Sequence, residues 1–439
     1  MTSTSMAPEG YIPRVADRTI ERYLSIFGAV EVSGTKWCGK TWTSLAHGKS
    51  VIYVDDDYDV AVADPALMTM GERPHVIDEW QLVPSIWDAV RRGVDKERGL
   101  RGGWILAGSS TPLAKDASDL PKHSGAGRIG RVRMFPMSLA ESGDSACTVS
   151  LEDLFAGTFT PSLIDEDSTD ARSLVEITCR GGWPEALGMD AEAAQVIARE
   201  YLRVLVQDTA PRHGRQGEAV SRMLSSISRT IGQPATQKTL FEDATGEAAD
   251  ALNGAQKLLV VEQLVFLRSV FLLEEIRGWV PPARSPKRLS TKPKRYLADS
   301  SLAIAQLGMG VGSLLHDWQT FGMMFENLCM RDLLVYASAL PSVGFEPVRY
   351  YRDDSGLEVD AIVELADGRW AAFAIKTSED KVPGAVDNLK RLKRKLCGAN
   401  GSRTRPPSSW RLSWVCPAMP ARLRRASTPC PSVPCAHRA

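Results

Sequence analysis

The chain of 439 residues carries 53 basic and 53 acidic residues, so its formal net charge is zero. A hydrophobic content of 44% and a charged content of 24% are typical of a globular protein, and the length predicts two or three domains. A zero net charge excludes a global electrostatic attraction to nucleic acid or to a membrane surface, so any such affinity must come from local patches.

The sequence predicts a cytoplasmic protein without a membrane partner. Residues 1–18 lack the apolar core of a signal peptide, and the most apolar stretch, residues 258–273, is interrupted by Glu262 and Arg268. The eight cysteines form no C-x-x-C pair, which argues against a zinc site or a disulfide framework and favours a reducing compartment.

Changes in composition and periodicity divide the chain into five predicted parts. They are an N-terminal arm (1–20), an α/β domain (21–165), a helical or winged-helix segment (166–300), a second α/β unit (301–397) and a basic, proline-rich tail (398–439). In the first α/β domain, apolar runs at 29–33, 50–57, 73–80 and 103–110 alternate with helical stretches such as 40–47 and 85–96. This alternation predicts a parallel sheet with helices on both faces.

The motif "GTKWCGKT" follows the first of these strands and opens a helix, which is the context of a phosphate-binding loop. Two glycines let the backbone turn so that its N–H groups point at phosphate oxygens, and the helix N-terminus adds positive charge. Lys40 is expected to reach the β- and γ-phosphates, and the Thr41 hydroxyl to bind Mg²⁺. The predicted ATP-binding residues are Gly34, Thr35, Lys36, Trp37, Cys38, Gly39, Lys40 and Thr41.

Acidic and hydroxyl residues end two of the other predicted strands. In "HVIDEW" we expect Asp78 to hold Mg²⁺ through water and Glu79 to polarise an attacking water, which favours hydrolysis over kinase chemistry. In "ILAGSSTP" a hydroxyl such as that of Ser109 is placed to sense the γ-phosphate or to orient the water.

A glycine-rich loop, "HSGAGRIGRVRMFPMS", brings arginines after the fourth strand. Arg128 or Arg131, and less readily Arg133, is expected to stabilise charge at the γ-phosphate, either in the same chain or from a neighbouring subunit. A role from a neighbouring subunit would require an oligomer. The alternative is a solvated basic loop that leads into an edge strand.

These motifs together resemble the bacterial and archaeal AAA-type ATPases that join an N-terminal P-loop domain to a C-terminal domain of unknown function. The resemblance spans residues 11–395, and its motifs are "YIPR", "GTKWCGKT", "VIDEWQ", "LAGSSTP", "HSGAGRI", "PMSLAES", "CRGGWPEAL" and "KRYLADSSLA". It implies an AAA-like P-loop domain, binding and presumptive hydrolysis of ATP, a helical or winged-helix middle segment, and a C-terminal domain similar to restriction endonucleases.

The middle segment shows helical periodicity from about residue 166. Residues 220–300 are predicted to form a small helical bundle that ends in a strand pair, and the basic turn at 281–295 would suit a winged helix.

The C-terminal α/β unit carries part of the frame of a metal-dependent nuclease. Such enzymes hold Mg²⁺ with an acid on one strand, an acid two residues before a lysine on the next, and often a helix glutamate. Here the frame maps onto Glu326, Asp360 and Lys376, but Ala374 stands where the second acid is needed. We therefore predict a degenerate frame that binds nucleic acid or protein without cutting. The alternative is that these side chains only pair with one another.

The tail and the helix before it are strongly basic. Residues 389–396, "LKRLKRKL", predict a basic helix that would contact phosphate backbone or be a solvated face. Beyond it no helical or strand period is visible, and prolines oppose both structures. The tail is either a functional basic segment or the product of a frame shift near Pro407; its composition favours the second.

The sequence thus predicts a Mg²⁺-dependent ATP hydrolase that couples nucleotide turnover to its C-terminal domains. One alternative is a nucleotide switch that recruits a protein partner with little turnover. Another is an ATP-regulated protein that binds or processes DNA.

Overall fold

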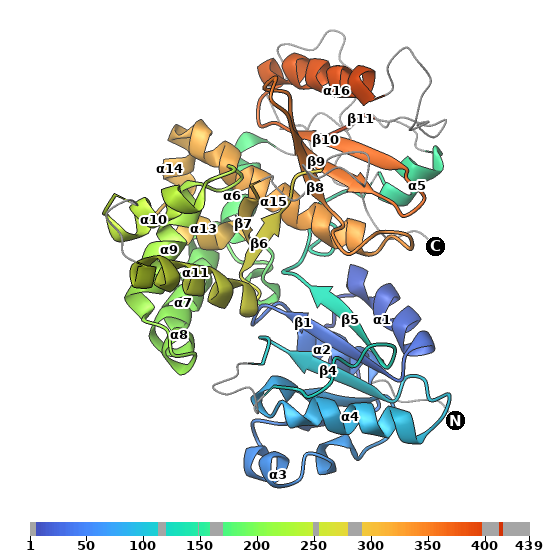
Figure 1. The fold of residues 1–439 in the computed structure, drawn as a ribbon. Helices are drawn as coiled ribbons and strands as arrows, with labels where there is room; N and C mark the ends of the chain where they lie inside the picture. The colour runs from blue at the N-terminus through green and yellow to red at the C-terminus, as the bar shows by residue number, and fades with distance from the viewer. Residues whose placement is uncertain are drawn as a thin grey trace. The chain divides into compact units, whose positions relative to one another are not determined.

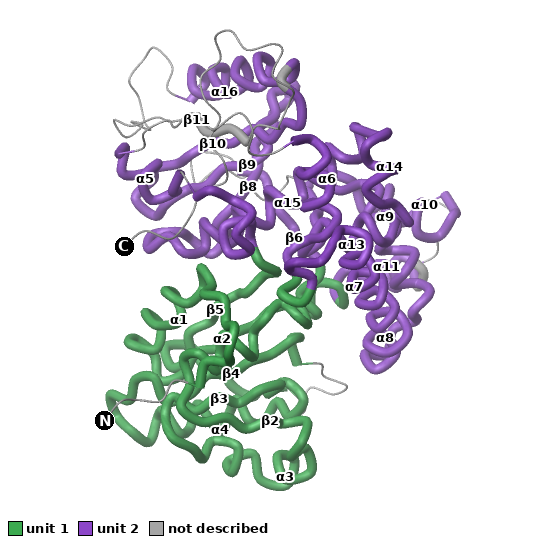
Figure 2. The backbone as a smooth tube through the Cα atoms, turned by 180° about the vertical axis from the view of Figure 1, so that it is seen from behind, with its two compact units in different colours: residues 1–137, 183–185, 266–272 green, residues 138–182, 186–265, 273–439 purple. Residues whose placement is uncertain are grey.

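The computed structural model describes residues 6–112, 120–147, 149–158, 170–248, 254–279, 292–396 and 412–415. The chain forms two compact units (Figure 2). Unit 1 contains residues 1–137, 183–185 and 266–272, and unit 2 contains residues 138–182, 186–265 and 273–439. Within the described residues, no helix is long and apolar enough to cross a membrane.

Unit 1 is built on a five-stranded sheet in the order β2-β3-β4-β1-β5. Figure 1 labels β1, β4 and β5 of this sheet. The strands are β1 (Ala29–Gly34), β2 (Ser50–Tyr53), β3 (His75–Asp78), β4 (Trp104–Gly108) and β5 (Ile129–Met134). Every neighbouring pair is parallel, as predicted. The helices are α1 (Val15–Ile26), α2 (Lys40–His47), α3 (Tyr58–Ala63) and α4 (Ser85–Lys96), with short 3₁₀ turns η1 (Leu67–Thr69) and η2 (Trp80–Leu82).

Apolar side chains cover both faces of this sheet because successive strand residues point to opposite sides. Val76 and Ile105 pack in the cluster that contains Ile20 of α1, whereas the next residues, Ile77 and Leu106, pack in the cluster that contains Trp87 and Val90 of α4. The predicted boundary at residue 20 falls inside α1, so the N-terminal arm is continuous with this unit and not separate from it.

The first half of unit 2 is mainly helical, as predicted. Its helices are α5 (Leu151–Ala156), α6 (Ala171–Arg180), α7 (Ala191–Val204), α8 (Ala210–Arg212), α9 (Gly217–Arg229), α10 (Gln237–Thr245) and α11 (Gly254–Ser269), whose last four residues belong to unit 1. β6 (Leu273–Ile276) and β7 (Lys294–Leu297) then form an antiparallel pair, so three helices are followed by a strand pair. The greater part of the predicted basic turn, residues 280–291, lies outside the described residues.

The second half of unit 2 begins with α13 (Ser300–Gln306), α14 (Val311–His316) and the long helix α15 (Trp318–Ser338). A four-stranded sheet follows, in the order β11-β10-β9-β8, with α16 (Val382–Leu396) between β10 and β11. Its strands are β8 (Arg349–Arg352), β9 (Glu358–Glu364), β10 (Trp370–Ile375) and β11 (Leu412–Val415). β9 pairs antiparallel with both β8 and β10, and β11 runs parallel to β10.

β11 corrects the prediction that the tail contains no strand. Ala372 pairs with Leu412 and Ile375 with Val415, so an existing strand edge provides the hydrogen-bond partners that the local sequence does not signal. Residues 397–411 and 416–439 lie outside the described part of the chain, and whether they are functional or frame-shifted stays a prediction.

Candidate nucleotide site

Backbone geometry fixes the loop between β1 and α2. Gly34 ends β1, where a Cβ atom would stand only 2.5 Å from the carbonyl oxygen of Met134, and Gly39 has a φ of +96°. Neither position accepts a larger residue without displacing the backbone or adopting a strained conformation. The loop therefore holds the tight turn that the motif predicts, and α2 begins at Lys40 immediately after it.

Lys40 is buried inside this loop. Its Nζ donates a hydrogen bond to the carbonyl oxygen of Thr35 at 2.8 Å, and only 5% of the residue is exposed. An ammonium has three N–H groups, so a backbone carbonyl is a weak substitute for the phosphate oxygens that this residue type binds in such loops.

Thr41 and Asp78, which are each predicted to bind Mg²⁺, lie in contact although they are far apart in the sequence. The Thr41 hydroxyl donates to Asp78 Oδ2 at 2.9 Å. The other carboxylate oxygen, Oδ1, is buried and accepts no hydrogen bond from the described residues. Burial raises the pKa of Asp78 to about 6. A hydroxyl beside a buried carboxylate with an unsatisfied oxygen is a donor set that suits Mg²⁺.

Glu79 follows in a left-handed backbone conformation, with a φ of +54°. Ser109, at the end of β4, donates to Glu79 Oε2 at 2.9 Å, and Gln81 Nε2 donates to the same oxygen. Ser109 thus contacts the predicted catalytic glutamate directly. Gln81 was not among the residues predicted for the site, although it lies in the motif "VIDEWQ" three residues after Asp78.

Arg14, in the motif "YIPR", contacts the phosphate loop, although it was not among the residues predicted for the site. Its guanidinium is buried and donates to the carbonyl oxygens of Cys38 at 2.7 Å and of Phe135 at 2.8 Å. One side chain therefore joins the phosphate loop to the residue that follows β5. Tyr11 makes a separate link between α1 and α2, because its hydroxyl donates to Asp17 at 2.7 Å and contacts Thr43 at 3.3 Å.

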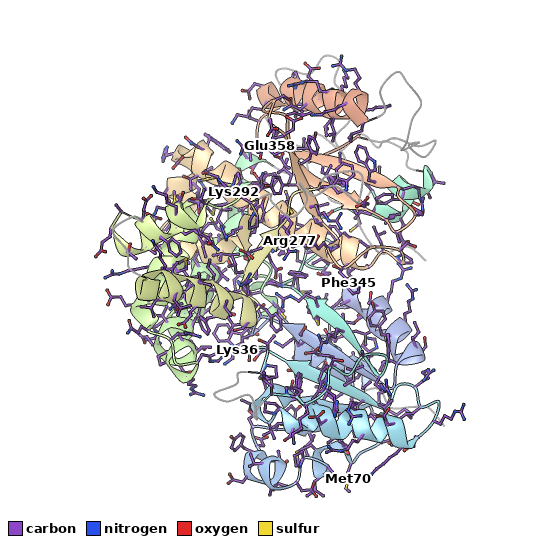
Figure 3. The ribbon with its side chains drawn as sticks, viewed as in Figure 1. Lys36, Met70, Arg277, Lys292, Phe345 and Glu358 are labelled. Atoms are coloured by element: carbon purple, nitrogen blue, oxygen red, sulfur yellow. The ribbon has the colours of Figure 1, made fainter. Side chains whose placement is uncertain are left out.

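The remaining loop residues differ in exposure. Lys36 and Trp37 are exposed, and Lys36 is marked in Figure 3. Cys38 and Thr35 are fully buried. The Cys38 N–H donates to the Thr35 carbonyl oxygen at 3.5 Å, so one N–H group of the loop is already engaged within it.

The structure corrects the prediction that Arg128 or Arg131 reaches the γ-phosphate within the same chain. β5 is paired with β1 so that Ile129 faces Ala29 and Met134 faces Gly34. Arg128, six residues before Met134, therefore lies at the end of the sheet opposite to the phosphate loop, about 20 Å away at about 3.3 Å per residue.

Both arginines also have acidic partners. Arg128 pairs with Asp95 at 2.9 Å, and Arg131 pairs with Glu31 at 3.1 Å. Arg133, nearer the loop, donates to the Phe271 carbonyl oxygen at 2.8 Å. A role from a neighbouring subunit stays a prediction.

The three residues of the predicted nuclease frame lie in unit 2. Lys376 Nζ and the Ile375 N–H both donate to Asp360 Oδ2 at 2.7 Å. Glu326 of α15 accepts from the Tyr296 hydroxyl at 2.6 Å and from Lys294 Nζ at 3.3 Å. Burial lowers the pKa of Lys294, but the facing carboxylates of Glu326, Asp360 and Glu358 outweigh it and hold the pKa above its usual range.

This frame differs from a metal centre. Ala374 is buried in an apolar cluster with Leu389 and Leu392. In the described part of the chain, no group of three or more histidine, cysteine, aspartate or glutamate side chains is arranged to hold a metal ion.

Comparisons with known proteins agree with the geometry of unit 1. Residues 27–143 match a family model described as an AAA domain, residues 171–312 match a domain of unknown function (DUF8612), and residues 321–405 match another (DUF4143). No curated protein sequence matches this chain. The parallel sheet and the phosphate loop of unit 1 agree with the match to an AAA domain, which supports ATP binding at a general level.

Two solved structures show weak overall similarity. The Walker-type ATPase PABY2304 of Pyrococcus abyssi is 12% identical, with a TM-score of 0.41 over 70% of this chain and 99% of that chain. The Orc1 protein of Aeropyrum pernix, in complex with DNA, is 14% identical, with a TM-score of 0.23 over 69% of this chain and 95% of that chain.

Proposed function

We propose that this protein is a Mg²⁺-dependent ATP hydrolase whose reaction centre is formed by Lys40, Thr41, Asp78 and Glu79. The observation that carries the proposal is the pairing of Thr41 with Asp78 at 2.9 Å beside the buried, unsatisfied oxygen of Asp78. That arrangement accommodates a hard cation next to a loop whose backbone suits phosphate.

Each residue of the reaction centre has a separate role in hydrolysis. Lys40 leaves the Thr35 carbonyl to bind the β- and γ-phosphates, and Glu79 orients a water against the γ-phosphorus. A bond forms between the water oxygen and phosphorus, the bond to the bridging oxygen of ADP breaks, and Glu79 takes the water proton. Mg²⁺, when bound beside Thr41 and Asp78, would neutralise charge on the phosphates. Ser109 and Gln81 hold the Glu79 carboxylate in place.

The test is ATP turnover in the wild type and in Glu79→Gln. A lost general base lowers turnover by about 10²–10⁴-fold while ATP binding persists. Glu72→Gln is the matched control, because Glu72 is an exposed glutamate of the same unit, paired with Lys49 at 3.7 Å. Turnover that Glu79→Gln leaves unchanged would contradict the role of Glu79. Mg²⁺-dependent ATP binding without measurable wild-type turnover would favour a nucleotide switch that recruits a protein partner.

We further propose that nucleotide turnover is coupled to unit 2 through the segment after β5. In unit 2, the Leu139 N–H donates to Asp332 Oδ2 at 3.0 Å and the Ala140 N–H to the Tyr336 hydroxyl at 3.1 Å. Asp332 in turn pairs with the buried Arg331, which also pairs with Asp299 at 2.7 Å. These contacts fasten the continuation of β5 to α15, a helix of the C-terminal part. Asp332→Asn is expected to uncouple the two units. The variant should keep ATP turnover, but that turnover should no longer respond to a ligand of the C-terminal part.

A second candidate function is ATP-regulated DNA binding, which the basic face of α16 favours. Lys390, Arg391 and Arg394 are exposed on this helix, and its other face packs Leu389 and Leu392 in the core. The order α15, β8–β10, α16, β11 is consistent with the proposed restriction-endonuclease-like fold of this part. Duplex or single-stranded DNA that neither binds nor alters ATP turnover would eliminate this candidate. If DNA binds, Lys390→Glu with Arg394→Glu should weaken it and reduce its dependence on salt.

A further inference from the structure

The nuclease-like frame contains a residue that the sequence motif does not include. Lys294 lies on β7, outside the predicted C-terminal α/β unit, and its side chain is only 2% exposed. Its Nζ contacts Glu358 Oε1 at 2.8 Å and Glu326 Oε1 at 3.3 Å. Glu358 of β9 is marked in Figure 3. One buried ammonium thus joins β7 to α15 and to β9.

The neighbours of Lys294 complete a closed set of opposite charges. Tyr296, two residues along β7, donates to the same Glu326 oxygen at 2.6 Å. Asp360 is paired with Lys376 at 2.7 Å and lies close enough to Lys294 to act on its charge. Three carboxylates therefore face two ammonium groups and, at Glu358, the guanidinium of Arg352 at 3.8 Å, which leaves little uncompensated charge for a divalent ion.

We infer that the Lys294 ammonium fills the cation position of this frame, so that unit 2 holds a nuclease-type carboxylate set without a divalent metal. The ammonium takes the place that a metal ion would have among the carboxylates. An ammonium is a compact cation with three donors, and it satisfies carboxylates that would otherwise coordinate a hard metal ion. Mg²⁺ needs about six oxygen ligands near 2.1 Å, and an ammonium between the two glutamates excludes that arrangement. Ala374 agrees with this, because a methyl group provides no ligand.

The inference is independent of ATP hydrolysis and is tested by Mn²⁺ binding to the full-length, nucleotide-free protein. Free Mn²⁺ is measured by its EPR signal, and every variant also carries Asp78→Asn so that the phosphate-loop site does not contribute. The parent should bind no Mn²⁺ that depends on Glu326. Lys294→Ala should gain about one Mn²⁺ per chain, because carboxylate oxygens freed of the ammonium suit Mn²⁺. Adding Glu326→Gln to Lys294→Ala should weaken that binding about tenfold or more.

Lys292→Ala is the matched control. Lys292, labelled in Figure 3, precedes Lys294 by two residues and is exposed, so its removal changes the net charge equally without opening the carboxylate set. It should leave Mn²⁺ binding unchanged. As a second readout, Mn²⁺ should raise the melting temperature of Lys294→Ala but not that of the parent or of Lys292→Ala.

Two results would overturn the inference. One is Mn²⁺ binding by the parent that Glu326→Gln removes, since the frame would then already take a metal. The other is a folded Lys294→Ala that gains no Mn²⁺. If Lys294→Ala does not fold, Lys294→Gln replaces it. If neither folds, the comparison of the parent with Glu326→Gln decides: equal absence of binding supports the inference, and a loss overturns it.

Discussion

The phosphate loop of unit 1 and the nuclease-like frame of unit 2 both set lysines beside carboxylates, yet they are built for opposite purposes. In unit 1, Lys40 rests on a backbone carbonyl, and Asp78 keeps a buried oxygen without a hydrogen bond from the described residues. In unit 2, Lys294 and Lys376 bind directly to the acidic side chains. Buried polar groups without a hydrogen bond cost stability and are retained where a ligand supplies the missing partner. Paired charges, in contrast, hold the elements that carry them together.

The largest expected effect concerns the ion pairs of Lys294 with Glu326 and Glu358 in unit 2. Lys294→Met removes the ammonium but keeps most of the side-chain length, and it leaves Glu326 and Glu358 facing each other. Breaking a buried ion pair in this way costs about 3–5 kcal/mol of unfolding free energy. Urea unfolding at neutral pH measures it. Exposed Lys292→Ala should change the same quantity by less than about 0.5 kcal/mol. A Lys294→Met protein as stable as the wild type would show that the two sites do not differ in this respect.

The next effect contrasts a lysine from each site. Lys40→Ala should reduce ATP turnover by about 10²–10³-fold, because a preorganised charge at the phosphates is lost. Lys376→Ala removes an ammonium that also lies near a carboxylate, but in the frame of unit 2, and should leave turnover within about twofold. Phosphate release under saturating ATP measures both. An equal fall in the two variants would mean that the frame takes part in ATP turnover.

A smaller effect concerns Asp78, where a mutation is expected to raise the free energy of unfolding and not to lower it. The pKa of Asp78 is raised by burial to about 6 from an ordinary 3.8, so the folded state holds a proton more tightly than the unfolded state. This contribution to stability is fully present below pH 3.8 and is lost as the pH rises through 6.

Asp78→Asn removes the buried charge and should therefore stabilise the metal-free protein at pH 8 by about 1–3 kcal/mol, while abolishing Mg²⁺-dependent turnover. The difference in stability between variant and wild type should vanish near pH 3.8. Chemical denaturation with EDTA at several pH values measures it. A variant less stable than the wild type at pH 8 would contradict the view that Asp78 is held in an unfavourable state for a ligand.

The smallest expected effect concerns Arg128. Because it pairs with Asp95 at the far end of the sheet, Arg128→Ala should change the turnover of an isolated chain by less than about twofold and its stability by at most about 1 kcal/mol. Turnover measured across protein concentrations, beside the solution mass, checks this. A large loss confined to concentrations at which the protein self-associates would establish a role in a neighbouring subunit.

The nucleotide site was largely predictable because its parts are short and local. Gly34, Gly39 and Lys40 lie within one loop whose backbone geometry follows from glycine and from the start of a helix. Asp78 ends a strand that was predicted to be parallel to the first, and the carboxyl ends of parallel strands share one edge of the sheet, which is where Asp78 contacts Thr41. The positions of Arg128 and Arg131 were not predictable in this way. The register of β5 against β1, and not the glycine-rich loop, determines which end of the sheet they reach.

The sequence by itself determined the phosphate loop, the parallel strands and the loss of an acid at Ala374, because each is fixed by residue type within a few positions. Only the tertiary structure decided how Arg14 joins Cys38 to Phe135, how β11 pairs with β10, and that Lys294 lies between Glu326 and Glu358. These contacts join segments far apart along the chain. Their partners are selected by packing and by the need to satisfy buried charges, which leave no periodic signal in the sequence.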